Sequence, residues 1–277
     1  MKTIHDIGEF GLIRQLQKQI PRAGDDCAVL PGGGLLTCDP VIEGIHFAPG
    51  TSAYRVGWKA MARNLSDIAA MAGTPRYAVI SLGLRKNTPV RYVTELYRGL
   101  RAVAVKFGCE IVGGDTAHIT GSQFIVVTLL GHARRPILRS GAKPGDTVFV
   151  TGKLGGSLAS GKHLTFTPRI REAQWLAKNF RIHAMMDISD GLASDLYRLV
   201  ESSRVGFDIS SAKIPGRLPG ALTDGEDFEL LFTVSPRDAG KLHKKFFEIG
   251  KVIRKPVVLL DGQPLTAKGY DHFPQRR

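Results

Sequence analysis

Aspartates recur along this sequence, several of them beside glycines, and they are the residues best suited to do chemistry. The stretches that carry them are Gly24-Asp25-Asp26, Asp39, Asn64-Leu65-Ser66-Asp67, Gly113-Gly114-Asp115, Asp187-Ile188-Ser189-Asp190-Gly191 and Gly225-Glu226-Asp227. Carboxylates at strand ends are well placed to bind hard cations such as Mg²⁺, and glycines let backbone amides approach a phosphate closely. If these carboxylates converge, they predict metal-assisted phosphoryl transfer, because the metal offsets their mutual repulsion and screens the phosphate oxygens.

Each of these motifs also has a purely structural interpretation. Asp26 could accept amides in a turn, and Asp67 could be an ordinary exposed helix residue. Gly113-Gly114-Asp115 could form a tight turn, while Asp187 or Ser189 could cap the helix that follows them. Spacing alone does not show that the carboxylates meet.

Alternating helices and strands must position these aspartates. Apolar residues at helical spacing predict helices over residues 10–20, 54–68, 90–107, 171–180, 192–200 and 239–247. Strands are predicted over residues 28–30, 35–38, 77–84, 111–112, 124–130, 147–151, 184–188, 230–234 and 257–260. The turn-rich segment from Arg134 to Asp146 predicts a boundary between an N-terminal domain, 1–136, and a C-terminal domain, 137–277. The fold class is therefore mixed α/β with two domains.

Several common phosphate-binding and hydrolytic motifs are missing. The sequence has no Gly-x-x-x-x-Gly-Lys-Ser/Thr loop, and no Gly-x-Gly-x-x-Gly after a strand. It also lacks the Gly-x-Ser-x-Gly of serine hydrolases. The glycine-rich stretch from Gly152 to Ser157 could touch a phosphate or form a flexible loop.

Composition places further limits on function. The chain has 277 residues, 43% of them apolar and 23% charged, which is ordinary for a soluble globular protein. It has neither the apolar run of a membrane span nor the apolar core of a signal peptide, so we expect a cytoplasmic protein without a membrane partner. Cys27, Cys38 and Cys109 lack the short spacing of a zinc site and suit buried thiols.

A formal net charge of +13 raises the alternative of a non-catalytic nucleotide or nucleic-acid binder. The basic residues are spread along the chain, however, with no long basic run and no interleaved aromatics. A solvated basic surface is the favoured interpretation, and we expect no nucleic-acid partner.

The order of the motifs resembles the thiamine-monophosphate kinase family, within the superfamily of aminoimidazole ribonucleotide synthetase and selenophosphate synthetase. The matching stretches are 24–30, 39–47, 64–75, 112–116, 139–146, 186–196, 225–232 and 268–273. The resemblance implies an aminoimidazole ribonucleotide synthetase-like architecture, whose N-terminal domain binds Mg-ATP and pairs its sheet in a homodimer, and whose C-terminal domain completes the active site. It implies transfer of the γ-phosphoryl group of ATP, with several Mg²⁺ ions, to thiamine monophosphate, which gives thiamine diphosphate.

The resemblance also implies roles for individual residues. The implied metal ligands are Asp26, Thr37, Cys38, Asp39, Asp67, Asp115, Asp187 and Asp190. Of these, Asp39, Asp115 and Asp190 are the implied catalytic carboxylates. The implied ATP contacts are Gly114, Asp115, Arg139 and Ser189, and the implied contacts to the thiamine phosphate are His46, Glu226 and Tyr270.

The sequence departs from the family pattern beside Asp39. Cys38 and Pro40 stand where the family usually has hydroxyl-bearing residues, which bears on metal coordination there. Another ATP-dependent enzyme of the same superfamily, such as a purine or selenophosphate synthetase, is the main alternative. The N-terminal region lacks the reactive cysteine beside glycines that a selenophosphate synthetase uses.

Overall fold

The computed structural model describes residues 3–20 and 22–273, and its chain divides into two compact units. Unit 1 combines residues 1–28, 138–157 and 181–277, whereas unit 2 combines residues 29–137 and 158–180. The chain passes from unit 2 to unit 1 between Ile137 and Leu138, whereas the sequence placed a boundary between residues 136 and 137. The two units nevertheless exchange segments, because 1–28 belongs with the C-terminal half and 158–180 with the N-terminal half.

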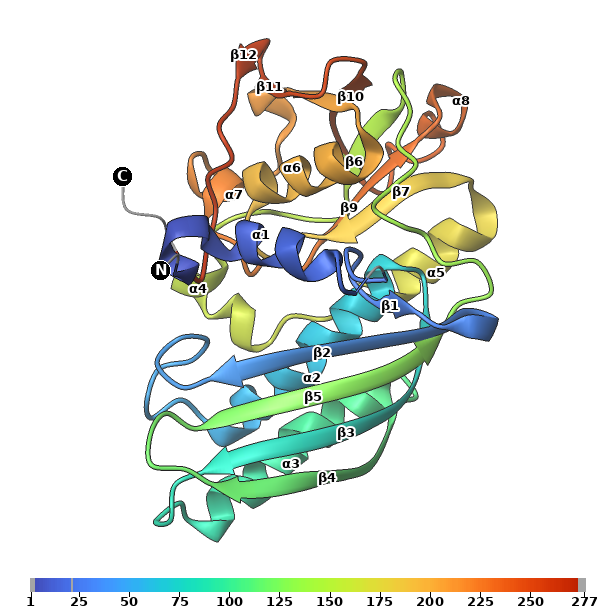
Figure 1. The fold of residues 1–277 in the computed structure, drawn as a ribbon. Coiled ribbons are helices and arrows are strands. Elements are labelled where there is room, and N and C mark those ends of the chain that lie inside the picture. Colours follow the sequence, from blue (N-terminus) through green and yellow to red (C-terminus); the bar gives the residue numbers. More distant parts are fainter. Residues whose placement is uncertain (1–2, 21, 274–277) are drawn as a thin grey trace. The chain divides into compact units, whose positions relative to one another are not determined.

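Unit 2 is built on a five-stranded sheet in the order β1-β2-β5-β3-β4 (Figure 1). The strands are β1 (Ala28–Val29), β2 (Gly34–Ile42), β3 (Thr74–Leu84), β4 (Glu110–His118) and β5 (Phe124–His132). The pairing of β3 with β4 is parallel, and β5 runs antiparallel to both β2 and β3. The helices are α2 (Ala53–Ala70), α3 (Val90–Lys106) and α5 (Ile170–Asn179). The unit also contains two 3₁₀ turns, Pro31–Gly33 and Lys162–Leu164.

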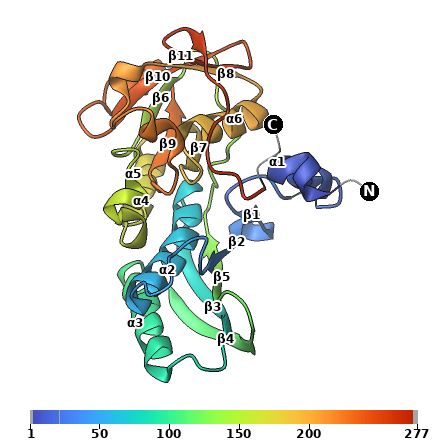
Figure 2. The ribbon, with the colours of Figure 1, turned by 90° about the vertical axis from the view of Figure 1, so that its left-hand side faces the viewer.

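Helices α2 and α3 lie on one side of this sheet (Figure 2). Val56, Met61, Leu65 and Ile68 recur along α2 at helical spacing, and all four are fully buried. Helix α3 approaches α2 so closely that a Cβ at Gly99 would lie 2.0 Å from the carbonyl oxygen of Tyr54, so this contact requires glycine. The predicted amphipathic helices therefore pair with each other as well as with the sheet.

The opposite face of this sheet is apolar and open within unit 2. Leu36, Leu130 and Tyr77 form a row across β2, β5 and β3, and each is at least 37% exposed. Val79, two residues beyond Tyr77 on the same face, is 41% exposed. An exposed apolar patch of this kind marks a candidate interaction surface.

Unit 1 is built on a seven-stranded sheet in the order β12-β11-β8-β10-β6-β9-β7. Its strands are β6 (Thr147–Val150), β7 (Ile182–Asp187), β8 (Gly206–Ile209), β9 (Leu230–Val234), β10 (Phe247–Ile253), β11 (Val258–Leu260) and β12 (Gln263–Pro264). Its helices are α1 (Ile4–Gln17), α6 (Leu192–Ser203), α7 (Gly220–Thr223) and α8 (Pro236–Ala239), with a 3₁₀ turn at Ser211–Lys213. The short α4 (Ser157–Ser160) lies at the chain border between the units.

Both faces of the unit 1 sheet are covered. Leu192, Leu196 and Leu199 of α6 belong to a buried apolar cluster that includes strand residues such as Val148 and Phe207. A separate group of stacked aromatic rings joins β6 and β9, where the ring centroids of Phe149 and Phe232 lie 5.5 Å apart. The central strand β6 is accordingly buried along its whole length.

Three predicted elements are wrong in extent or type. The predicted helix 239–247 is a short α8 followed by turns, because Gly240 interrupts the helix, and β10 then begins at Phe247. The strand predicted over 35–38 continues to Ile42, so Asp39 and Pro40 lie inside β2. The strand predicted to end at residue 112 continues to His118, so Gly113-Gly114-Asp115 is part of β4 and is not a tight turn.

Candidate functional site

Asp26, Arg139 and Asp187 form the charged centre of unit 1. The Arg139 guanidinium donates from Nη2 to Asp26 Oδ1 (2.7 Å) and from Nε to Asp26 Oδ2 (3.2 Å). Its backbone amide donates to Asp25 Oδ1 (2.6 Å). One carboxylate oxygen of Asp187 lies within 4.8 Å of one of Asp26. The geometry is a two-pronged arginine–carboxylate fork beside a second carboxylate.

Arg139 remains charged although it is buried. Burial acts to lower the pKa of its guanidinium, but the negative charges of Asp26, Asp187 and Asp195 outweigh burial, and the net pKa is raised. The Asp26 side chain is only 1% exposed. Arg139 is therefore the countercharge that makes a buried carboxylate tolerable at this position.

The loop that leaves β7 brings together residues for which sequence predicted three different roles. The Ser189 carbonyl accepts a hydrogen bond from the Glu226 amide (2.7 Å), and the Asp190 carbonyl accepts one from the Tyr270 amide (2.9 Å). The Asp190 carboxylate forms an ion pair with Arg198 on α6. Unit 1 thus gathers predicted metal, nucleotide and acceptor residues around one short loop.

Glu226 has a strained backbone. Its φ is +56°, in the left-handed region, and Phe228 has a φ of +52°. Left-handed backbone at residues other than glycine is unfavourable, and it occurs where the surrounding structure enforces it, often at functional sites. Here the enforcing contacts are the hydrogen bonds from the amides of Glu226 and Phe228 to the carbonyls of Ser189 and Ile188.

The glycine-rich stretch from Gly152 to Ser157 is held by the protein's own acids. The Gly155 amide donates to Asp227 Oδ2 and the Gly156 amide to Asp224 Oδ2, both at 2.8 Å. Asp227 is 1% exposed. These two amides are committed to carboxylates, so this is a fixed turn in which they do not cradle a phosphate.

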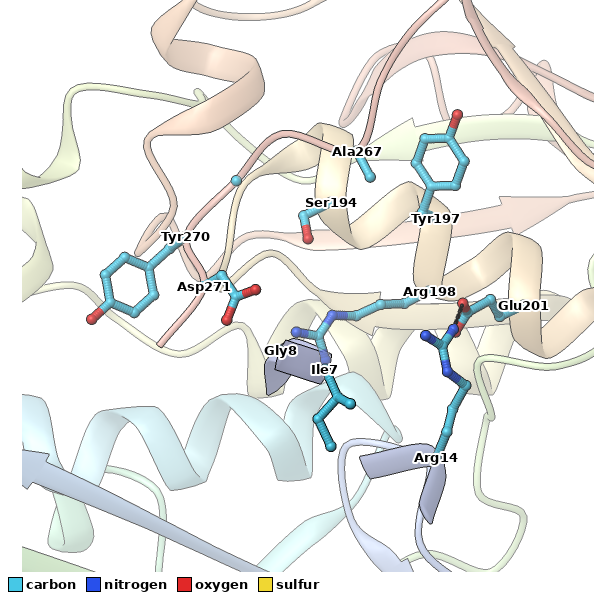
Figure 3. Close-up of a pocket in the computed structure, with 11 residues that line it drawn as sticks. Ile7, Gly8, Arg14, Ser194, Tyr197, Arg198, Glu201, Ala267, Tyr270 and Asp271 are labelled. Atoms are coloured by element: carbon cyan, nitrogen blue, oxygen red, sulfur yellow. Dashed lines mark hydrogen bonds and ion pairs between the residues drawn. The ribbon is translucent and has the colours of Figure 1, made fainter. Parts of the chain in front are cut away.

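A cavity of about 380 Å³ lies in unit 1, between α1, α6 and the segment that carries Tyr270 (Figure 3). Figure 3 shows the Asp271 carboxylate turned toward Arg198 and the Tyr270 ring turned away from it. The Tyr270 side chain is 45% exposed and makes an edge contact with His272. A flat ligand could therefore stack on this ring from solvent.

Unit 2 contributes a second group of oxygen atoms, on β2 and α2. Thr37 donates its hydroxyl hydrogen to Asp67 Oδ2. The Asp39 amide donates to Asn64 Oδ1 (3.0 Å), and Arg63 Nη2 lies 3.3 Å from Asp39 Oδ2. Thr37 and Asp39 share a strand face, and Asn64 and Asp67 share a helix face, which explains why these side chains meet.

His46 lies in a tight turn after β2 and is 7% exposed. Its Nδ1 accepts a hydrogen bond from the Ile42 amide (3.0 Å), and its carbonyl accepts one from the ammonium of Lys59 (2.6 Å). Lys59 is fully buried, and its Nζ also lies 2.9 Å from His163 Nδ1. Lysine is almost never fully buried without partners. Here the ammonium of Lys59 binds the His46 carbonyl and so holds the turn in place.

Cys38, Gly114 and Asp115 lie away from this group. Cys38 is on the exposed face of β2, and Thr128 Oγ1 donates to its sulfur (3.3 Å). Gly114 and Asp115 lie on the edge strand β4, where a Cβ at Gly114 would lie 1.9 Å from the Ile80 carbonyl oxygen. Adjacent strands are about 4.8 Å apart, so the three steps from β2 to β4 separate Asp39 from Asp115 by about 14 Å. Unit 2 of one chain does not bring these two aspartates together.

The donor atoms suit Mg²⁺. Carboxylate oxygens in unit 1, and carboxylate oxygens with the Thr37 hydroxyl in unit 2, are the hard ligands that this ion prefers. Among the described residues, no helix is long and apolar enough to cross a membrane.

Sequence reasoning missed residues that support the site. Arg63 stands directly before the stretch Asn64-Leu65-Ser66-Asp67, which it did single out, so Arg63 could have been found from its helical spacing to Asp67. Lys59, Asp195 and Arg198 carry no comparable signal, because their importance depends on burial.

Comparison with known proteins identifies relatives along most of the chain. Residues 24–133 match the AIR synthase related protein N-terminal domain, and residues 143–258 match the corresponding C-terminal domain. A thiamine-monophosphate kinase of Rhodopirellula baltica is 36% identical in an alignment 274 positions long. The alignment covers 88% of this chain and 86% of the relative. The thiamine-monophosphate kinase of Aquifex aeolicus is 35% identical in an alignment 310 positions long, gaps included. The alignment covers 98% of this chain and 99% of the relative.

The fold agrees with a solved structure described as AaThiL complexed with AMPPCP and TMP. The TM-score is 0.90 at 34% sequence identity, with 99% of each chain covered. The mixed α/β fold class expected from the sequence pattern and the family resemblance are both confirmed.

Proposed function

Because this chain belongs to the thiamine-monophosphate kinase family of AIR synthase related proteins, we propose that it transfers the γ-phosphoryl group of ATP to thiamine monophosphate, forming thiamine diphosphate. The observation that carries this assignment to the residues is the loop after β7. Its carbonyls bind the amides of Glu226 and Tyr270, so predicted metal, nucleotide and acceptor residues are joined by backbone hydrogen bonds.

Positioning and charge neutralisation are sufficient for this reaction. The acceptor is a phosphate that is already ionised near neutral pH, so no strong general base is needed. Arg139 uses Nε and one Nη2–H for Asp26, which leaves Nη1 and the second Nη2–H for phosphate oxygens. Ser189 would contact ATP, while His46, Glu226 and Tyr270 would orient the acceptor.

Each unit brings its own oxygen ligands for Mg²⁺. Asp26 and Asp187 supply them in unit 1, with Asp190 close by in sequence, and Thr37, Asp39 and Asp67 supply them in unit 2. A Mg²⁺ ion held by these oxygens would screen the negative charge of the phosphates.

Incubation of purified protein with thiamine monophosphate, ATP and Mg²⁺, followed by chromatography of thiamine phosphates, tests the proposal. We expect thiamine diphosphate, and none after the metal is chelated with EDTA. A folded sample that forms no thiamine diphosphate would refute the assignment. A panel of purine-pathway and selenium acceptors in the same assay would then distinguish the other enzymes of the superfamily.

A homodimer is the second part of the proposal. The apolar row Leu36, Leu130 and Tyr77 lies on the open face of the unit 2 sheet, where a second copy could cover it. A dimer would also account for Asp115, which one chain keeps about 14 Å from Asp39 across the sheet. A partner's copy of this strand could supply the missing carboxylate.

Val79→Glu is expected to shift the protein from dimer to monomer, because a charge placed on the apolar face would be desolvated on pairing. Light scattering after gel filtration measures the mass. The matched control is Val105→Glu, which changes another exposed valine, on α3 (73% exposed), and should leave the mass unchanged. A Val79→Glu protein that keeps the dimer mass would place the interface elsewhere.

A further inference from the structure

Asp195 is a buried carboxylate to which no role has yet been given. It lies in the first turn of α6 and is 0% exposed. Its Oδ2 accepts hydrogen bonds from the amides of Ser189 (3.1 Å) and Asp190 (3.2 Å). One oxygen of Asp195 therefore fixes two consecutive peptide groups of the loop after β7.

The same loop is held from its other side by the residues it positions. While the amides of Ser189 and Asp190 donate to Asp195, their carbonyls accept from Glu226 and Tyr270. The Ser189–Asp190 peptide group is held on both sides, because its N–H donates to Asp195 and its carbonyl accepts from Glu226, and the carbonyl of the next peptide group accepts from Tyr270. Asp195 thus acts on the Glu226 and Tyr270 backbones through the loop.

Arg198 completes this arrangement. Its Nε lies 3.4 Å from Asp195 Oδ1, and its Nη2 pairs with the Asp190 carboxylate. One arginine therefore links the carboxylate that holds the loop backbone to the carboxylate that the loop presents.

Placing a carboxylate here is costly. Burial raises the pKa of Asp195, and the neighbouring Asp190 and Asp187 raise it further, against the opposing effects of Arg198 and Arg139. A buried acid that only filled space could be replaced by an apolar residue at no loss. Asp195 accepts two backbone amides and lies beside an arginine, and an apolar residue could make neither interaction.

We infer that Asp195 is a positioning residue, which sets the loop Ser189–Asp190 so that the metal, nucleotide and acceptor contacts are aligned together. The inference rests on the proposed function for the roles of Ser189, Asp190, Glu226 and Tyr270. It predicts that one substitution remote from the reacting atoms disturbs all three ligands at once.

The test compares Asp195→Ala with Asp195→Asn, whose side-chain oxygen can still accept both amides. For Asp195→Ala we expect kcat to fall about 100-fold, which is the loss that a misplacement of about 1 Å in an active site causes. We also expect KM for both ATP and thiamine monophosphate to rise about tenfold. The kcat of Asp195→Asn should be at least about tenfold higher than that of Asp195→Ala. Hydrogen exchange of the peptide spanning residues 186–196 should be faster in Asp195→Ala than in the wild type.

The matched control is Asp146→Asn. Asp146 is also a buried carboxylate of unit 1 (3% exposed), which accepts the Lys143 amide (2.8 Å) and pairs with His183 (2.8 Å). Its variant should lose similar thermal stability while KM values stay within twofold of the wild type. Equal kinetic losses in Asp146→Asn and Asp195→Ala, or unchanged kinetics in a folded Asp195→Ala, would overturn the inference.

Binding measurements separate this inference from the proposed function. Calorimetric titration with Mg²⁺ and the non-hydrolysable analogue AMPPCP requires no turnover. If the wild type makes no thiamine diphosphate but binds AMPPCP, the function fails while the comparison of variants still stands. Binding that is about tenfold weaker in Asp195→Ala, and largely restored in Asp195→Asn, supports the positioning role; equal binding in all three proteins contradicts it.

Discussion

Replacing Asp39 by asparagine is expected to abolish thiamine diphosphate formation while the protein stays folded. The carboxylate of Asp39 lies beside Arg63 and is held over α2 by the hydrogen bond from its own amide to Asn64. An asparagine keeps this shape but removes the negative charge that Mg²⁺ requires. We expect kcat to fall at least about 100-fold, the scale of losing one preorganised electrostatic group. Loss of one charge among several like charges should leave the unfolding midpoint nearly unchanged.

Asp115→Asn should behave in the same way, because it removes another predicted metal ligand. The control for both is Glu110→Gln, which neutralises an exposed carboxylate on the same strand as Asp115 and should retain full activity. Steady-state assays over a range of Mg²⁺ concentrations measure the effect. Full activity in both aspartate variants would contradict the metal assignment.

Replacing Arg139 by methionine is expected to cause the largest loss of stability. The substitution leaves Asp26, whose side chain is 1% exposed, without its countercharge. Breaking a buried pair by removing one partner typically costs about 3–5 kcal/mol of unfolding free energy. The double variant Arg139→Met/Asp26→Asn should recover most of this loss, because the uncompensated carboxylate is also gone. Urea unfolding of the two single variants and the double variant measures the coupling.

A surface pair in the same unit supplies the control for Arg139. Arg14 lies 3.2 Å from Glu201, with both side chains more than half exposed. Arg14→Met should cost less than about 1 kcal/mol, as exposed pairs do. If Arg139→Met were no more costly than Arg14→Met, or if Asp26→Asn failed to rescue it, the pair would not be the buried anchor described above. Both Arg139 variants should bind ATP weakly.

Local sequence patterns predicted most elements of the fold, where one face of an element is apolar. Helices α2 and α3 and strand β9 lie where the sequence predicted them. Their apolar residues are the ones buried in the fold, so the apolar pattern in the sequence was enough to locate them. The pattern failed at β10 and β8, whose short strands lie deep in a sheet formed by distant segments. It also failed at residues 113–118, since Gly114, a residue type that usually weakens a strand, is needed here for close approach to β3.

The candidate site was predictable to the extent that resemblance supplied it. The spacing of Asp187, Ser189 and Asp190 suggested a helix cap as readily as a ligand set. What decides between them is long-range: Asp26 and Arg139 are 113 residues apart in sequence, and Ser189 meets Glu226 only through tertiary structure. No local pattern encodes such pairs. The roles of Cys38 and Asp115 stay predictions, since within unit 2 neither joins Thr37, Asp39 and Asp67.

The division of unit 1 into three chain segments has a consequence for biosynthesis. On the ribosome, residues 1–28 emerge before unit 2, yet they belong to a unit whose remaining segments begin at residue 138. Asp25 and Asp26 must therefore wait, unpaired, while unit 2 is translated, until Arg139 leaves the exit tunnel. Contacts that close such long loops form late and slowly. Until then, the carboxylates of Asp25 and Asp26 stay exposed to solvent on the nascent chain.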